Sequence, residues 1–108
     1  MKKAYKVVIT HSAEEDLKEI VDFIAEDEPG IALKIFDKLE HRIRSLKELP
    51  DRGRVVPELK DKDILAYREV IESPWRIVYS IIEDTVYILF VIDGRRNVND
   101  LFLKKLVR

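Results

Sequence analysis

The stretch WRIVYSIIEDTVYILFVI, residues 75–92, decides the fold of this 108-residue chain. Two runs rich in β-branched and aromatic residues flank Glu83-Asp84, which predicts two neighbouring strands joined by a tight turn. Arg76 interrupts the first run, and Arg96 follows shortly after the second. A guanidinium in an apolar strand must be paired, reach the sheet edge or face a site that binds negative charge, because an unpaired buried charge is costly.

Two more strand-like runs precede this pair. The β-branched and aromatic content predicts strands over residues 5–10, 67–72, 75–82 and 85–92. If Ser73-Pro74 is a two-residue hairpin loop, Ile71 lies opposite Arg76 in the neighbouring strand. We therefore expect the three C-terminal strands to pair in antiparallel order.

This register sorts the side chains of the hairpin onto two faces. Arg76 shares one face with Glu69 and Tyr67. The other face is more apolar and holds Val70, Trp75, Ile77 and Tyr79. We expect the helices to cover this apolar face, which leaves Arg76 on the opposite, more open one. An ion pair between Arg76 and Glu69 is then the simplest role for the arginine, and it would add little stability.

Two helical segments separate the first strand from the other three. Ser12 and Glu15 have the spacing of a capping box, which predicts a helix over roughly 12–26. Pro29 suits the first turn of a second helix, in which apolar residues recur every three or four positions as far as Leu49. The break between the two segments contains Pro and Gly, so we expect an antiparallel helical hairpin.

The remaining segments complete one expected domain, residues 1–108. Residues 50–66 contain Pro, Gly and a run of charges, which predicts a long surface loop bordering any functional site. Residues 99–108 predict a short amphipathic helix with a basic end. The predicted fold class is α+β, with the order β-α-α-β-β-β and a short C-terminal helix. The two-helix hairpin would pack on a four-stranded, mostly antiparallel sheet.

Composition narrows the classes of function. The chain is 46% hydrophobic, enough for one core, and it has no cysteine, which excludes disulfides and thiolate metal sites. No apolar run approaches the ~18–20 residues of a membrane span, and we expect a cytoplasmic protein without metal or cofactor. The net charge of −1 argues against broad nucleic-acid binding. Residues 94–108 nevertheless carry five Lys/Arg against one acid, so any polyanion contact is expected there.

The order of these elements, with short motifs along nearly the whole chain, resembles the RelE/ParE superfamily of bacterial and archaeal toxins. The matching motifs include Leu49-Pro50, Gly53-Arg54, Pro57-Glu58-Leu59, Arg68-Glu69-Val70-Ile71, Trp75-Arg76-Ile77-Val78-Tyr79 and Gly94-Arg95-Arg96. The resemblance implies the toxin of a type II toxin–antitoxin module, with a cognate antitoxin protein as its partner. One branch of the superfamily cleaves mRNA on the ribosome, and another inhibits DNA gyrase.

For the mRNA-cleaving branch, the resemblance implies a set of site residues. Arg76 and Arg96 match arginines that hold the scissile phosphate, and Glu58 matches a loop glutamate that serves as base. Preorganised bidentate donors stabilise the charge that develops when a ribose 2′-hydroxyl attacks phosphorus. Other cations would position the RNA backbone: Arg68, Arg95, Lys104 and Lys105. Our first hypothesis is therefore a ribosome-dependent endoribonuclease, with ribosome and mRNA as partners.

Two positions depart from the pattern of that branch. Phe102 stands where the branch has a tyrosine and cannot transfer a proton, and Glu69 stands where a second cation would help. His11 and His41 lie in the helical half, where we expect solvated roles, so the sequence identifies no general acid. Inhibition of DNA gyrase, which needs no catalytic constellation, is the alternative. A family member that has lost its toxicity is a further one.

Overall fold

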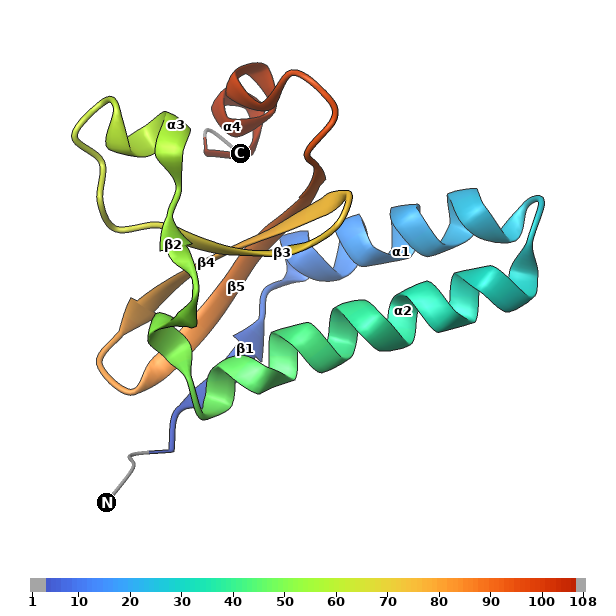
Figure 1. Cartoon of the computed structure of the whole chain (residues 1–108), viewed down its shortest axis with the longest axis horizontal. Coiled ribbons are helices and arrows are strands. Elements are labelled where there is room, and N and C mark those ends of the chain that lie inside the picture. Colours follow the sequence, from blue (N-terminus) through green and yellow to red (C-terminus); the bar gives the residue numbers. More distant parts are fainter. Residues whose placement is uncertain (1–3, 107–108) are drawn as a thin grey trace.

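The computed structural model describes residues 4–106, and its central element is a five-stranded sheet (Figure 1). The strands are β1 (Lys6–Ile9), β2 (Arg54–Val55), β3 (Arg68–Glu72), β4 (Trp75–Ile82) and β5 (Thr85–Asp93). Their order is β1-β5-β4-β3-β2, with β1 parallel to β5 and all other neighbours antiparallel. The α+β fold class is confirmed. The sheet has five strands where we predicted four, because β2 forms inside the predicted 50–66 loop.

The β3–β4 hairpin has the predicted register. Ile71 lies opposite Arg76 and Glu72 lies opposite Trp75. Between β4 and β5 the register shifts, since Val78 pairs with Phe90 whereas the next residue of β4 pairs with Ile88. Such a bulge bends the strand and increases its twist, which the sequence pattern did not indicate.

The predicted helical hairpin consists of α1 (His11–Ala25) and α2 (Pro29–Arg44) (Figure 1). The cap of α1 is Thr10, whose hydroxyl accepts a hydrogen bond from the Ala13 N–H at 3.3 Å. Our prediction of Ser12 as the cap was wrong. The Thr10 hydroxyl also donates to the Ile88 carbonyl at 2.7 Å, so pairing with β5 sets where the helix begins. No helix in residues 4–106 is long and apolar enough to cross a membrane.

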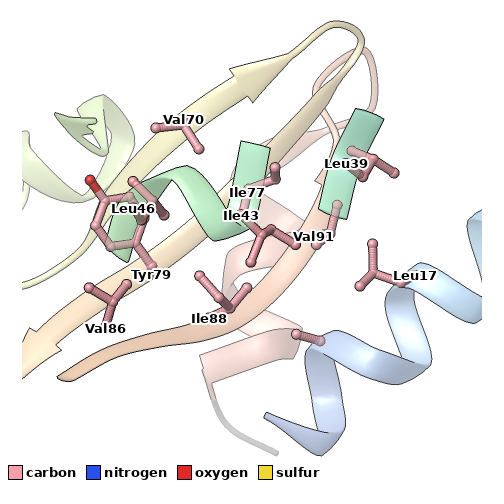
Figure 2. Close-up of a cluster of buried hydrophobic side chains, with 11 residues drawn as sticks. Leu17, Leu39, Ile43, Leu46, Val70, Ile77, Tyr79, Val86, Ile88 and Val91 are labelled. Atoms are coloured by element: carbon pink, nitrogen blue, oxygen red, sulfur yellow. The ribbon is translucent and has the colours of Figure 1, made fainter. Parts of the chain in front are cut away.

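The main core lies between this hairpin and one face of the sheet (Figure 2). Its buried side chains come from both helices, from the turn after α2 and from the strands: Leu17, Leu39, Ile43, Leu46, Val70, Ile77, Tyr79, Val86, Ile88 and Val91. The three residues of the predicted apolar face that belong to this core, Val70, Ile77 and Tyr79, confirm which face the helices cover. Two short 3₁₀ turns, Ser45–Lys47 and Pro50–Arg52, lead from α2 towards β2.

Gly53 holds this connection against the sheet. Its N–H donates to the Tyr79 hydroxyl at 3.1 Å, and that hydroxyl donates to the Pro50 carbonyl at 2.6 Å. A Cβ atom at position 53 would lie 2.4 Å from the Tyr79 oxygen and 2.5 Å from the Glu69 carbonyl oxygen. Only glycine allows so close an approach, and β2 can therefore pair with β3.

A second core covers the other face of the sheet, which we had expected to be open. Two short helices, α3 (Pro57–Lys60) and α4 (Val98–Leu106), supply part of it (Figure 1). The buried cluster comprises Val56, Leu59, Val78, Phe90, Ile92, Val98 and Phe102. Segment 50–66 is thus only partly a surface loop, since its residues Val56 and Leu59 pack on the strand face that carries Arg76.

Candidate functional site

Arg76 of β4 lies at the edge of this second core and is only 8% exposed. Its Nε donates to Glu69 Oε1 of β3 at 2.7 Å. Its Nη1 and Nη2 donate to the two carboxylate oxygens of Glu58 at 2.9 and 2.7 Å. Each nitrogen of the guanidinium is therefore bonded to a carboxylate, and the contact with Glu58 is the strong bidentate kind.

Glu69 extends these contacts into an alternating chain of charges. Its side chain is fully buried, and its second oxygen accepts a hydrogen bond from Arg54 Nε of β2 at 2.7 Å. We call Arg54, Glu69, Arg76 and Glu58 together the arginine–glutamate chain. Two positive and two negative groups cancel within it, which makes burial of Arg76 and Glu69 tolerable.

The contacts keep both partners of the bidentate pair charged. Hydrogen bonding to Glu58 raises the pKa of the Arg76 guanidinium, and the bonds to Glu69 add to this effect although burial opposes it. Hydrogen bonds from Arg76 lower the pKa of the Glu58 carboxyl below its ordinary value of 4.5. Glu58 is therefore a carboxylate at neutral pH.

The aromatic ring of Phe102, from α4, lies over the guanidinium of Arg76 in the arginine–glutamate chain. The carbon at the centre of the Arg76 guanidinium lies 5.7 Å from the centroid of the Phe102 ring. The same ring packs edge-on against Phe90 with 5.7 Å between centroids. The two histidines lie elsewhere: His11 begins α1, where it pairs with Glu15, and His41 is an exposed residue of α2.

Arg96 takes a different place from Arg76. It is exposed beyond the end of β5 and lines a pocket of about 120 Å³ together with Asp93 and Lys105. Within residues 4–106 no hydrogen bond or ion pair joins the Arg96 side chain to the arginine–glutamate chain. The structure thus brings together Arg76 and Glu58 of the predicted site, and it places Arg96 beside acidic neighbours.

The other predicted cations mostly have internal partners. Arg68 donates to the Gly53 carbonyl at 2.8 Å, and Arg95 pairs with Asp93 at 2.7 Å on the surface. Lys105 forms an ion pair with the buried carboxylate of Asp16 in α1. Lys104, next to it, is exposed. Of these four cations, three therefore have internal partners in the described part of the chain.

Sequence reasoning missed the roles of Arg54 and Asp16. Asp16 is 5% exposed, and its second oxygen accepts the Val91 N–H at 3.0 Å, so one carboxylate joins α1, β5 and α4. A signal was present, because Asp16 stands three residues after Ala13 and four before Ile20, on the apolar side of the helix. For Arg54 the signal was weaker, since its partner Glu69 lies 15 residues away in the sequence.

Comparisons with solved structures place the fold among toxins of toxin–antitoxin systems. The chromosomal ParDE system from P. aeruginosa contains a chain that is 19% identical, with a TM-score of 0.70 over 83% of this chain and 96% of that one. The RelBE2 toxin–antitoxin complex from Mycobacterium tuberculosis gives 21% identity and a TM-score of 0.63 over 84% and 99%. At such identities the likeness shows the fold alone.

A mutant of the toxin RelE from E. coli, in its free state, shares the fold as well. It is 12% identical, with a TM-score of 0.63 over 98% of both chains. A search of curated proteins found no match. The family model described as the ParE toxin of the type II toxin–antitoxin system parDE matches residues 7–98. Since this match spans most of the sequence, the chain belongs to the ParE toxin family of type II toxin–antitoxin systems.

Proposed function

We propose that this toxin inhibits its host by binding a protein target, DNA gyrase, without cleaving RNA, and that a cognate antitoxin neutralises it. One observation carries the proposal: all three nitrogens of Arg76 are already bonded to the carboxylates of Glu58 and Glu69. An arginine held in this way is a structural cross-link between β3, β4 and α3. It is not a free donor for a phosphate.

Charge argues in the same direction. A phosphate reaching Arg76 has to displace Glu58 from a bidentate contact, and it then lies beside the buried carboxylate of Glu69. The phosphate and the Glu69 carboxylate are both negative, and two like charges side by side repel strongly where water is excluded. The ring over Arg76 is that of Phe102, which has no proton to transfer. Inhibition by binding requires none of these groups.

The test uses the purified toxin in a DNA supercoiling assay with gyrase. We expect supercoiling to fall as the toxin approaches the gyrase concentration, and addition of the cognate antitoxin should restore it. The same preparation, incubated with programmed ribosomes, should leave the mRNA intact when its ends are mapped. Unaffected supercoiling together with arrested growth would overturn the proposal.

Ribosome-dependent mRNA cleavage is the second candidate, and one observation favours it. Glu58, the candidate base, lies within hydrogen-bond distance of Arg76, the candidate phosphate-binding group. In this candidate the ribosome–mRNA complex displaces Glu58 from Arg76. Glu58 is then free to accept the proton of the attacking 2′-hydroxyl, while Arg76 and Arg96 hold the phosphate.

Arg96 separates the two candidates because it is exposed and its loss should not affect folding. If the chain is an endoribonuclease, Arg96→Ala should reduce cleavage by about 100-fold or more, as removal of one transition-state donor commonly does. Lys34→Ala, which removes an exposed positive charge of α2 outside the predicted site, is the matched control for charge. If the toxin acts by binding, ribosomes incubated with the wild type or with the Arg96 variant should yield no cut mRNA.

A further inference from the structure

A polar pocket of about 400 Å³ lies where the second half of α2 meets the end of β3 and the two 3₁₀ turns. Its lining residues come from these elements, so the pocket is separate from the contact between α1 and α2 and from the arginine–glutamate chain. Most of them carry charge or can carry it: Lys38, His41, Arg42 and Arg52, together with Asp37 and Glu72. Ser45 adds a hydroxyl group.

The cations of this pocket are not neutralised as those around Arg76 are. Within residues 4–106, neither Lys38 nor His41 forms an ion pair. Arg42 contacts Glu72 through two nitrogens, but both lie 3.4 Å from the same carboxylate oxygen. These contacts are longer than the 2.7–2.9 Å of a good charge-assisted bond. Arg42 is therefore held loosely and can turn towards another anion.

Two features of the local structure bring the cations together. Lys38 and Arg42 stand four residues apart on one side of α2, a spacing at which like charges repel and destabilise a helix. Arg52 is fixed beside them, because its Nη1 donates to the Ser45 hydroxyl at 3.0 Å and that hydroxyl donates to the Arg42 carbonyl at 2.6 Å. A bound anion would remove the repulsion between these three cations.

We propose that this pocket, which we call the α2–β3 pocket, binds the phosphates of a nucleic-acid backbone. Ammonium and guanidinium groups are the usual side-chain donors to backbone phosphates. The rise of α2 separates Lys38 from Arg42 by about 6 Å along the helix. One strand of a duplex advances about 3.4 Å per phosphate, so the two side chains can contact different phosphates of the same strand.

The openness of the pocket favours a backbone over a small phosphorylated ligand. Lys38, His41 and Arg52 are all exposed. A small ligand commonly buries most of its surface in its site, which side chains this exposed do not provide. A backbone that passes across the pocket needs no such enclosure.

This location differs from the one expected from the sequence, which placed any polyanion contact in residues 94–108. There, Arg95 is already paired with Asp93, and Lys105 with Asp16. Binding at the α2–β3 pocket is a further activity, and it does not depend on how the toxin inhibits its host.

The test measures binding of the full chain to short fluorescein-labelled duplexes, one of DNA and one of RNA with the same sequence, by fluorescence anisotropy. We expect binding whose log affinity falls linearly with log salt concentration. The variant Lys38→Gln with Arg52→Gln should bind about tenfold more weakly, and the slope should become shallower by about 2, since each lost phosphate contact removes ~0.9. The duplex that binds more tightly identifies the nucleic acid that supplies the backbone.

A matched variant separates this pocket from general electrostatic attraction. Lys60→Gln with Lys62→Gln makes the same change of charge at exposed positions outside the pocket, and it should keep the wild-type affinity. An equal loss in both double variants, or no binding of either duplex by the wild type, overturns the proposal. Displacement of the duplex by inorganic phosphate as effectively as by unlabelled duplex, at equal phosphate concentration, also overturns it, because the site then takes single phosphates.

A gain of affinity provides a second test, which a merely structural role of the pocket would not produce. Glu72→Gln removes the carboxylate that competes for Arg42 and should strengthen binding several-fold. Glu26→Gln, the same change of charge at an exposed position at the end of α1, is the control. Unchanged circular dichroism spectra establish that the variants fold. No gain in Glu72→Gln, or the same gain in the control, contradicts the role of Arg42.

Discussion

Arg76 shows how a charged residue can be accommodated in an apolar strand. Its guanidinium bonds to a fully buried glutamate, Glu69, and to a partly exposed one, Glu58. Arg54, in the neighbouring strand β2, pairs with the other carboxylate oxygen of Glu69. We had expected a surface ion pair of little energetic weight. Burial changes that expectation, because loss of one partner leaves the others charged and away from water.

Replacing Glu69 by alanine tests this interpretation at the residue scale. The variant leaves Arg76 Nε and Arg54 Nε without their carboxylate partner. We expect the free energy of unfolding to fall by about 3 kcal/mol or more, measured by urea denaturation, as for other broken buried pairs. Arg95→Ala is the control, because it removes one partner of an ion pair on the surface. A similar loss in both variants would contradict the buried role of Glu69.

At the scale of elements, two short helices decide the character of the site. Helix α3 carries Glu58 to Arg76, and α4 lays Phe102 over it. Helix α4 is attached to the rest of the chain by its apolar residues Val98 and Phe102 and by the ion pair of Lys105 with Asp16. The position of α4 therefore depends in part on its ion pair with α1, a helix that packs on the opposite face of the sheet.

This attachment predicts a local change on replacement of Lys105 by alanine. Loss of the ion pair should loosen α4 and raise amide hydrogen exchange across Val98–Leu106 by about tenfold or more, while α2 keeps its protection. Lys104→Ala is a matched control, since its side chain is exposed on the same helix. Equal exchange in the two variants would show that the apolar contacts alone hold α4.

At the scale of the whole molecule, the sheet separates two surfaces of different character. One side carries the arginine–glutamate chain under α3 and α4, and the other carries the helical hairpin and the main core. The extents of 42 × 35 × 22 Å reflect how far the hairpin projects past the sheet (Figure 1).

Stability of the whole molecule should depend on pH through Glu58. Its pKa is lower in the folded chain than the ordinary 4.5, because Arg76 donates two hydrogen bonds to it. A lowered pKa contributes stability above the unfolded value, and this contribution is lost as pH falls through the folded value. The free energy of unfolding should thus decline below about pH 4.5.

Urea denaturation from about pH 7 down to about pH 3 measures this decline, and Glu58→Gln is the comparison. The variant lacks the titrating group, so its curve should be flatter in the acid range. Asp93, whose pKa is also lowered by its bonds with Arg95, is present in both proteins and contributes equally. Curves of the same slope would contradict the role of Glu58.

Much of the architecture could be predicted because it depends on short-range patterns. The register of β3 and β4 follows from a two-residue turn, and the hairpin follows from apolar spacing and Pro29. The fifth strand could not be predicted, because β2 has only two residues and depends on the approach of Gly53 to Tyr79. The cap at Thr10 depends on β5, which lies 78 residues away.

By itself the sequence determined the fold class, the hairpin register and the residues that face each side of the sheet. It also placed Arg76 and Glu69, on neighbouring strands, on the same face of the sheet. Only the tertiary structure decided what Arg76 does, because its other partner, Glu58, lies 18 residues away, on a helix that the sequence pattern did not reveal. Local periodicity sets the face on which a side chain lies, whereas its neutralising partner depends on where distant segments pack.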